Sequence, residues 1–300
     1  MSLLDRAVVT LLPAVPKPVV RKLSSRYIAG SEIDDARRVV GSLRAAGKLA
    51  TVDVLGEEIT RADDAAAITH AYLDVIDALD ADGLEANVSV KLSGVGLDVD
   101  RDLARENLTA IAERATFVRI DMEDSSTTDA TLGLYRALVA ERRENLGVVL
   151  QAALRRTVDD ARALAGANVR LCKGIYVEPP EIAFRDFDEI RSSYVRTLET
   201  LLDGGCYLGI ATHDEWLVDE GIRLVRQRGL EPDAYEFQML LGVRPALGDR
   251  IVAAGHRLRI YVPFGRQWYE YSLRRLQENP KIAGYVAGDL GRSLFRKRRP

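Results

Sequence analysis

The sequence lacks the cysteine and histidine patterns that would indicate a metal site or a disulfide scaffold. Its two cysteines, Cys172 and Cys206, are far apart and match no metal-binding spacing. A reducing compartment therefore fits the chain better than a disulfide scaffold does. The three histidines, His70, His213 and His256, are too scattered to predict a metal site, and no H-E-x-x-H sequence occurs. We therefore expect no bound metal.

Several catalytic and nucleotide-binding motifs are also missing. There is no G-x-G-x-x-G, no Walker A sequence and no G-x-S-x-G elbow. The net charge is only -3, which gives no global argument for nucleic-acid binding. The basic stretch at residues 296–299 is local and fits a solvated end. We expect no nucleic-acid partner.

The N-terminal region lacks a secretory signal, because no basic segment precedes a long apolar one. The apolar stretch 8–20 is broken by Pro13, Pro16, Lys17 and Pro18, so it cannot span a bilayer. It can still lie on a membrane surface or cover the bottom of a core. We expect a cytoplasmic protein, with residues 1–30 as the candidate for peripheral contact with the inner face of the cell membrane.

What the sequence does contain is a regular alternation of strand-like and helix-like segments. The predicted strands are Ala50–Leu55, Asn87–Leu92, Phe117–Met122, Val148–Ala152, Val169–Lys173, Tyr207–Ala211, Tyr235–Leu240 and Leu258–Val262. The predicted helices between and after them are Ala62–Leu79, Arg101–Ala115, Asp129–Arg143, Thr157–Leu164, Asp188–Leu202, Glu215–Arg228, Pro245–Ala254 and Gln267–Glu278.

Eight such units predict an α/β fold with parallel strands, and a closed (β/α)8 TIM barrel rather than an open sheet. An open doubly wound sheet is the alternative. No Gly-, Pro- or Ser-rich linker divides the chain. The simplest organisation is one domain, with a helical arm at residues 1–48 and a barrel at residues 49–300.

Polar residues stand at seven of the eight predicted strand ends, where the chemistry of a parallel barrel gathers. Lysine or glutamine inside an apolar strand is costly unless it is paired or serves a site. Lys91 supplies positive charge for an anionic substrate group, and Asp121 and Glu57 supply carboxylates that could orient such cations. Another set could hold an anionic or hydrogen-bonding cofactor: Gln151, Arg170, Lys173 and the Gly174 backbone.

The last predicted helix adds a second positive group. Tyr271, Arg274, Arg275 and Glu278 fall within an arc of roughly 100° on this helix. Two adjacent guanidiniums form a fork suited to a small carboxylate. A solvated helix face with an ion pair is the alternative interpretation.

Other candidate residues have plain structural alternatives. Lys91 could be a buried ion-pair partner, Asp121 could cap the following turn, and His213 could be a packed residue at a strand end. Strand alternation places Arg170 and Lys173 on opposite faces unless the strand ends near Gly174. Cys172 fits a small packing residue.

Taken in order, these segments resemble the proline dehydrogenases of the short, monofunctional bacterial type. The matching segments cover residues 50–280 and are Asp53-Val-Leu-Gly-Glu57, Val90-Lys-Leu-Ser93, Arg119-Ile-Asp-Met-Glu123, Leu150-Gln-Ala152, Arg170-Leu-Cys-Lys-Gly-Ile-Tyr176, Ala211-Thr-His-Asp214, Glu236-Phe-Gln-Met239, and Tyr261-Val-Pro-Phe-Gly265 with Arg274, Arg275 and Glu278. The resemblance implies a distorted barrel that binds FAD and oxidises L-proline to Δ1-pyrroline-5-carboxylate. It also implies a membrane quinone as electron acceptor and a separate pyrroline-5-carboxylate dehydrogenase for the next step.

The resemblance also implies roles for individual residues. Asp121 and Arg170 match positions active in catalysis. Substrate binding is implied for Lys91, Tyr261, Arg274 and Arg275, with Glu57, Tyr176 and Glu278 in support. FAD contacts are implied for Met122, Gln151, Arg170, Lys173, Gly174, Ile175, Thr212 and His213.

Two residues depart from the family pattern after the fifth strand. Cys172 replaces a valine, and Ile175 replaces an alanine. The resemblance implies that position 175 contacts the flavin mainly through its backbone. Two other functions remain as alternatives. One is a flavin enzyme of this fold that acts on hydroxyproline or another cyclic amino acid. The other is a barrel that binds a carboxylate without turning it over.

Overall fold

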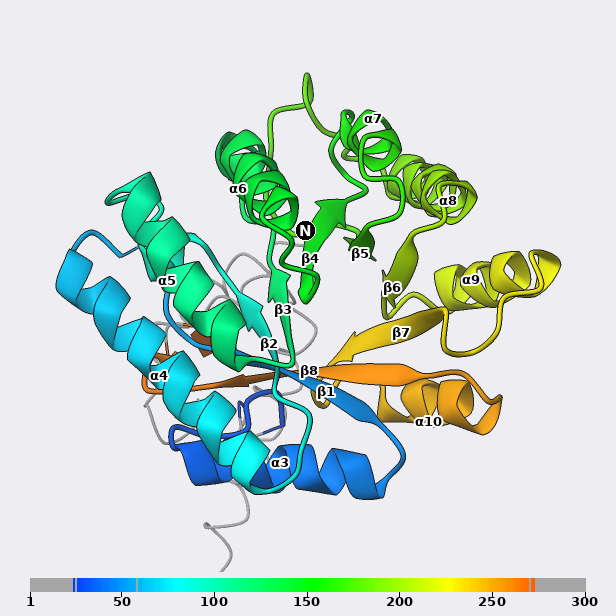
Figure 1. Ribbon diagram of the computed structural model, residues 1–300. Coiled ribbons are helices and arrows are strands. Elements are labelled where there is room, and N and C mark those ends of the chain that lie inside the picture. Colours follow the sequence, from blue (N-terminus) through cyan, green and yellow to red (C-terminus); the bar gives the residue numbers. More distant parts are fainter. Residues whose placement is uncertain (1–23, 25, 58, 270, 273–300) are drawn as a thin grey trace, which may run out of the picture.

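A computed structural model describes residues 24, 26–57, 59–269, 271 and 272 of the chain. Its centre is a closed barrel of eight parallel strands that follow one another in chain order, with β8 closing against β1 (Figure 1). The strands are β1 (Leu49–Val54), β2 (Asn87–Val90), β3 (Phe117–Ile120), β4 (Leu146–Gln151), β5 (Asn168–Cys172), β6 (Tyr207–Ala211), β7 (Tyr235–Leu240) and β8 (Leu258–Phe264). This confirms the predicted (β/α)8 fold.

Helices surround the barrel; α3 precedes β1, and the others connect consecutive strands (Figure 1). They are α3 (Ile33–Ala45), α4 (Ala62–Ala81), α5 (Arg101–Arg114), α6 (Thr128–Ala140), α7 (Thr157–Arg162), α8 (Phe187–Asp203), α9 (Glu215–Gln227) and α10 (Pro245–Ala253), with 3-10 turns at Ser93–Val95 and Ser125–Thr127. Side-chain caps set two of the starts: Asp100 accepts two backbone N–H groups of α5, and Asp186 does the same for α8. The predicted elements that lie within the described residues end within three residues of these bounds.

The hydrophobic core lies between the strands and the helices. Outward-facing strand residues such as Val88, Val118 and Leu208 are fully buried there. Helix α4 meets them with residues spaced three or four apart, which include Ile68, Tyr72, Val75, Ile76 and Leu79. The two-residue period of the strands and the 3.6-residue period of the helices thus place apolar residues in one shell between sheet and helices. The other face of each strand points into the barrel.

Strand β8 extends two residues beyond its predicted end at Val262. The prediction stopped before Pro263 because proline lacks the N–H that a strand ladder requires. The structure shows why Pro263 is tolerated. The Tyr261 carbonyl accepts the last bond from Leu241 on the β7 side, so a Pro263 N–H would face that side after β7 has ended.

Residues 28–30 lie at the carboxyl end of β8. The Ala29 N–H donates to the Pro263 carbonyl at 2.9 Å, and the Gly265 N–H donates to the Gly30 carbonyl at 3.0 Å. Of the two alternatives for the N-terminal segment, membrane contact and cover of the barrel bottom, the second does not apply to residues 28–30. The Pro263 carbonyl lies beyond the end of β7 and needs a donor, which the Ala29 N–H supplies. Residues 1–23 and 25 lie outside the described residues.

Two inward-facing glycines make room for long side chains inside the barrel. A Cβ atom on Gly147 would lie 2.4 Å from Nη1 of Arg119 and 2.8 Å from the Asn168 carbonyl oxygen. A Cβ atom on Gly209 would lie 2.6 Å from Nε2 of Gln238. Both distances are shorter than van der Waals contact, so these positions must lack a side chain for the guanidinium and the amide to fit.

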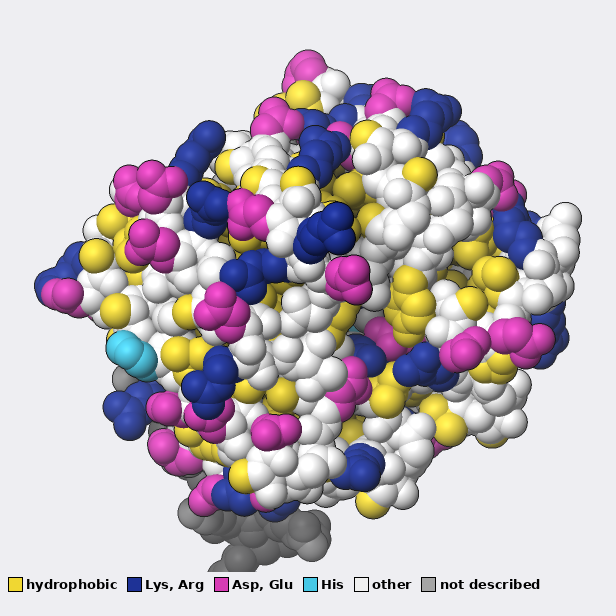
Figure 2. All heavy atoms as spheres, viewed as in Figure 1, with side chains coloured by type: hydrophobic (Ala, Val, Ile, Leu, Met, Phe, Trp, Pro, Cys, Tyr) yellow, Lys and Arg dark blue, Asp and Glu magenta, His cyan; other side chains and the backbone are white. Residues whose placement is uncertain are grey.

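Outside the barrel, acidic and basic side chains are interspersed over the face that Figure 2 shows, without a block of one sign. Across the described residues, no helix combines the length and the apolar character needed to cross a bilayer.

The interior glycines give a direct test of the packing. We expect Gly147→Ala to lower the free energy of unfolding by about 1–3 kcal/mol, because the new methyl group overpacks against Arg119 and a backbone oxygen. Gly133→Ala is the matched control, since Gly133 lies in α6 with nothing within 4 Å of the added carbon. Urea unfolding should show the control unchanged or stabilised by up to about 1 kcal/mol. Equal stability of Gly147→Ala and the wild type would refute the claim that Arg119 needs a glycine at position 147.

Candidate active site

A cavity of about 350 Å³ opens at the carboxyl ends of the strands. Twelve of the predicted site residues line it: Lys91, Asp121, Met122, Gln151, Arg170, Lys173, Gly174, Ile175, Tyr176, Thr212, His213 and Tyr261. Val149, Ala211, Met239 and Leu240 contribute apolar wall. These twelve residues come from six strands or the loops after them. They meet at the end of the barrel where parallel barrels carry their chemistry, as predicted.

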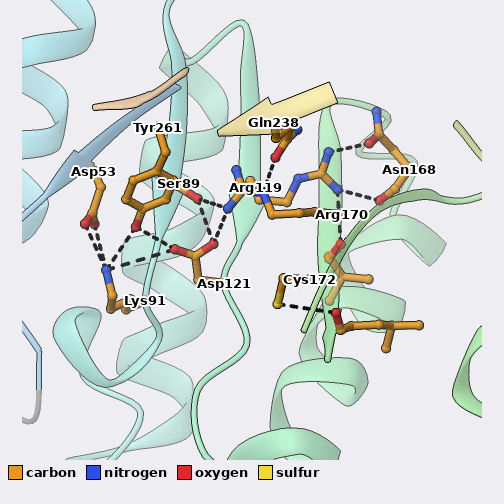
Figure 3. A network of polar contacts seen from close by, with 12 residues as sticks. Asp53, Ser89, Lys91, Arg119, Asp121, Asn168, Arg170, Cys172, Gln238 and Tyr261 are labelled. Atoms are coloured by element: carbon orange, nitrogen blue, oxygen red, sulfur yellow. Dashed lines mark hydrogen bonds and ion pairs between the residues drawn. The ribbon is translucent and has the colours of Figure 1, made fainter. Parts of the chain in front are cut away.

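Asp121 is the centre of the polar contacts below the cavity (Figure 3). Its Oδ1 accepts from Ser89 Oγ at 2.8 Å and from Arg170 Nη1 at 2.7 Å, and its Oδ2 accepts from the Tyr261 hydroxyl at 2.9 Å. The expectation that Asp121 could cap a turn is therefore wrong. Its carboxylate joins β2, β5 and β8 across the barrel, and the adjacent turn is capped by Asp124 instead.

Lys91 is a part-buried ion-pair partner and also lines the cavity. Its Nζ lies 2.9 Å from Asp53 Oδ2, 3.1 Å from the Tyr261 hydroxyl and 4.0 Å from Asp121 Oδ2. Burial by itself would lower the pKa of Lys91, but the charges of Asp53 and Asp121 outweigh burial and raise the pKa above its ordinary value. Lys91 therefore stays a cation at any working pH.

Tyr261 stays protonated. Burial, followed by the charges of Asp121 and Asp53, raises the pKa of its phenol well above the ordinary value. Its hydroxyl donates to Asp121 and accepts from Lys91, which fixes the ring orientation. The guanidinium of Arg170 lies over the ring, with Cζ 5.3 Å from the centroid. The ring thereby forms a rigid wall of the cavity.

Arg170 extends from β5 to partners on three other strands. Its Nε donates to Gln238 Oε1 at 2.5 Å, and its Nη1 donates to Ser89 and Asp121. Its Nη2 has no hydrogen-bond partner within the described part of the chain. Because the residue lines the cavity, that nitrogen is available to a ligand.

Strand β5 ends at Cys172, so strand alternation does not force Arg170 and Lys173 onto opposite faces. Lys173 and Gly174 follow the strand rather than belong to it, so Lys173 can share the cavity with Arg170. Gly174 has φ +97°, and a Cβ atom there would lie 2.8 Å from Gln151 Oε1. The prediction that Cys172 only fills space is incomplete, since it lines the cavity. Burial raises the pKa of its thiol to about 11.

Ion pairs secure the polar wall at β6. Asp214 Oδ2 accepts from Lys173 Nζ at 2.6 Å and from Arg191 Nε at 2.8 Å. These bonds, led by the one from Arg191, hold the pKa of Asp214 below its ordinary value. His213 Nε2 accepts the Leu240 N–H at 2.9 Å, so the neutral imidazole is held at this strand end as the packing interpretation expected, and it also lines the cavity.

Some predicted residues do not line this cavity, and others were missed. Glu57 is half-buried in the loop after β1, and Arg274, Arg275 and Glu278 lie outside the described residues. Sequence reasoning did not assign these contributors: Asp53, Ser89, Asp214 and Gln238. All four sit at or near predicted strand ends, which was the available signal, but their partners are far away in the sequence. Over the described residues, no cluster of His, Cys, Asp or Glu is arranged to hold a metal ion.

Comparison with known proteins identifies relatives of this arrangement. A family model described as Proline dehydrogenase matches residues 36–287. The proline dehydrogenase of Deinococcus radiodurans is 37% identical over 274 residues, which cover 88% of each chain. Proline dehydrogenase 2 of Bacillus subtilis is 34% identical over 272 residues, which cover 89% of each chain.

A similar fold occurs in a solved structure. The crystal structure of proline utilization A from Bdellovibrio bacteriovorus aligns with a TM-score of 0.81 at 23% identity. The alignment covers 91% of this chain and 36% of that one, so the longer protein contains a barrel of this kind as one part.

The Lys91–Asp53 pair should be costly to break. We expect Lys91→Met to lower the free energy of unfolding by about 3–5 kcal/mol, because the fully buried Asp53 carboxylate loses its cation. The double variant Asp53→Leu with Lys91→Met should recover most of that loss in urea unfolding, since neither charge then remains unpaired. A double variant less stable than Lys91→Met would contradict the pairing.

Proposed function

The chain belongs to the proline dehydrogenase family, and from this premise we propose that it uses FAD to oxidise L-proline to Δ1-pyrroline-5-carboxylate. The observation that carries the proposal is a cavity that Lys91 and Arg170 both line. Each is held by buried carboxylate contacts, so each presents a fixed positive charge. A small zwitterion and an electron-accepting cofactor both need such charges.

The cavity has the chemistry that the flavin of FAD requires. Its apolar walls suit a flat ring system, and hydrogen-bonding groups stand among them. Flavin carbonyl oxygens and ring nitrogens are mainly acceptors. Arg170 Nη2 and the Lys173 ammonium are donors at this wall, and Gln151, whose amide nitrogen donates to the Glu123 carbonyl, adds a side-chain oxygen.

We assign the binding of FAD to the residues named from the sequence: Met122, Gln151, Arg170, Lys173, Gly174, Ile175, Thr212 and His213. When bound there, FAD would supply the acceptor for the hydride, and so for the two electrons, that leaves the proline ring. The protein's part is orientation. Met122 and the Tyr261 ring limit the space, and Arg170, which lines the same cavity, keeps the N–H groups of Nη2 for a ligand.

The proline carboxylate would be held by Lys91 together with Arg274 and Arg275. Lys91 Nζ donates to both Asp53 oxygens and to the Tyr261 hydroxyl, so its part would be a fixed positive charge beside the carboxylate. We assign Glu57 and Glu278 to support the arginines. Tyr261 packs on the substrate ring, and Tyr176, which also lines the cavity, supports this wall. Asp121 acts by holding Arg170 and Tyr261 in place.

The substrate amine must lose a proton before its ring carbon–nitrogen double bond can form. Lys91 and Tyr261 cannot accept this proton because both remain protonated. His213 Nε2 already accepts the Leu240 N–H. We propose that the amine loses its proton to solvent before it binds, and that the enzyme selects the neutral amine.

We also propose a membrane quinone as the final acceptor, with this protein at the inner face of the cell membrane. Side chains near the cavity mouth support it: Ile175, Val177 and Phe187 are 54%, 93% and 53% exposed. An apolar acceptor can approach over such a surface. As the family resemblance implies, we also propose that a separate pyrroline-5-carboxylate dehydrogenase takes the product.

The direct experiment is an anaerobic absorbance titration. The purified protein reconstituted with FAD should show flavin bands that bleach when L-proline is added. Trans-4-hydroxy-L-proline should bleach them far more slowly, because the Tyr261 wall leaves little room beside the ring. Failure to bind FAD would refute the cofactor, and faster bleaching by hydroxyproline would reassign the substrate.

The pH profile should report the substrate amine alone. We expect kcat/KM for L-proline to rise tenfold per pH unit between about pH 6 and pH 9, because only the neutral amine reacts. Tyr261→Phe should lower the value but keep the slope, since the phenol does not titrate in this range. A plateau near neutral pH that Tyr261→Phe abolishes would identify an enzyme base and contradict this account.

The acceptor surface can be tested separately. Val177→Asp should lower kcat/KM for a short-chain ubiquinone by about 10-fold, since burying a valine side chain is worth about 1.5 kcal/mol. Turnover with a water-soluble dye should stay unchanged. Val139→Asp on α6, where the side chain is 42% exposed, is the matched control. Equal losses with quinone and dye would show that Val177 serves the cavity itself.

A further inference from the structure

A chain of buried polar side chains extends from the active-site guanidinium toward the other end of the barrel. Arg170 Nε donates to Gln238 Oε1 at 2.5 Å, and Gln238 Nε2 donates to Glu236 Oε1 at 2.6 Å. The same Glu236 oxygen accepts from Arg259 Nε at 2.8 Å, and Glu236 Oε2 accepts from the Tyr207 hydroxyl at 3.1 Å. Arg170 and Gln238 line the cavity, whereas Glu236 does not.

The orientation of the Gln238 amide decides whether this chain works. An amide has nearly the same shape when its oxygen and nitrogen are exchanged, but its hydrogen-bonding is then reversed. With the nitrogen toward Arg170, two donors would face each other and Arg170 Nε would lose its acceptor. Glu236 excludes that arrangement, because an ionised carboxylate accepts hydrogen bonds and cannot donate one.

The surroundings keep Glu236 in this state. Burial by itself would raise its pKa, but the charge and hydrogen bond of Arg259 and the bond from Gln238 outweigh burial and lower the pKa. Arg259 is in turn held by Glu85, at 3.1 Å from Nη1. Gly209 leaves the space in which the amide lies, 2.6 Å from where a Cβ atom would be. The amide therefore has one position and one favourable orientation.

We propose that Glu236 is a positioning residue that fixes the Gln238 amide, and through it holds the Arg170 guanidinium in place at the cavity wall. The consequence for catalysis rests on the proposed function, in which Arg170 contacts FAD. The positioning itself does not, because every contact in the chain lies within the protein.

Two substitutions separate the hydrogen-bond acceptor from the charge. Glu236→Gln loses the charge but keeps an oxygen that can accept from both Gln238 and Arg259. Glu236→Asp keeps the charge and withdraws the oxygen by one methylene group. We expect Glu236→Gln to bind FAD within about 3-fold of the wild type and Glu236→Asp to bind it about 10-fold more weakly, as for the loss of one charged hydrogen bond. Glu85→Gln, at the far side of Arg259, is the matched control and should leave FAD affinity unchanged.

Three readouts distinguish positioning from a merely structural role. The first is the Arg170 side-chain Nε–H resonance in protein without FAD, which should exchange slowly with water in the wild type and Glu236→Gln and rapidly in Glu236→Asp. The second is FAD affinity from fluorescence quenching. The third is a double-mutant cycle, in which Glu236→Asp adds no further loss of affinity to Gln238→Leu because both act through one contact.

The outcomes are decisive in either direction. Slow Arg170 exchange in Glu236→Asp, additive losses in the cycle, or a Glu236→Gln variant as impaired as Glu236→Asp would each overturn the proposal. If the wild type fails to bind FAD, the proposed cofactor is wrong, and the Nε–H exchange rates in the three proteins still decide whether Glu236 positions Arg170.

Discussion

The Asp121 carboxylate is the contact on which the candidate active site depends. It receives hydrogen bonds from Ser89 on β2, Arg170 on β5 and Tyr261 on β8. Tyr261 in turn accepts from Lys91, which is also paired with Asp53, so the Asp121 carboxylate links both cavity-lining cations. The barrel makes this possible, because side chains from opposite strands meet at its axis. No single element of the fold could bring these groups together.

Charges inside a barrel are costly, and this chain offsets the cost by pairing. Buried or part-buried cations are paired with buried carboxylates in the interior: Lys91 with Asp53, Arg170 with Asp121, and Arg259 with Glu236. Such pairs add little net stability compared with an apolar core, but they are strongly unfavourable to disrupt. Here the pairs serve to fix the positions of the charged side chains. A guanidinium held by three partners needs no reorganisation when a ligand arrives, which is how a preorganised polar site acts.

The sequence predicted the barrel and most of the cavity lining for a physical reason. Hydrophobic periodicity is local, so strands and helices could be located, and the polar strand ends then had only one place to meet. Cross-barrel partners could not be predicted in the same way. Gln238 was visible as a polar residue in a strand, but its contact with Arg170 depends on the register of β5 through β7. The Lys91 partner was expected to be Asp121 or Glu57, whereas Asp53 lies closest. Pro263 misled the prediction of β8 because its missing N–H faces a region that β7 does not reach.

The most direct test of this account is a double-mutant cycle on Asp121 and Arg170, read as the anaerobic rate at which L-proline bleaches the bound flavin in a single turnover. The account predicts that Asp121→Asn and Arg170→Met are each severely slowed and that the double variant is hardly slower than the worse single variant, because the two side chains act as one unit. Losses that multiply would show that Asp121 and Arg170 act independently. That result would contradict the claim that the buried carboxylate works by holding the guanidinium in place.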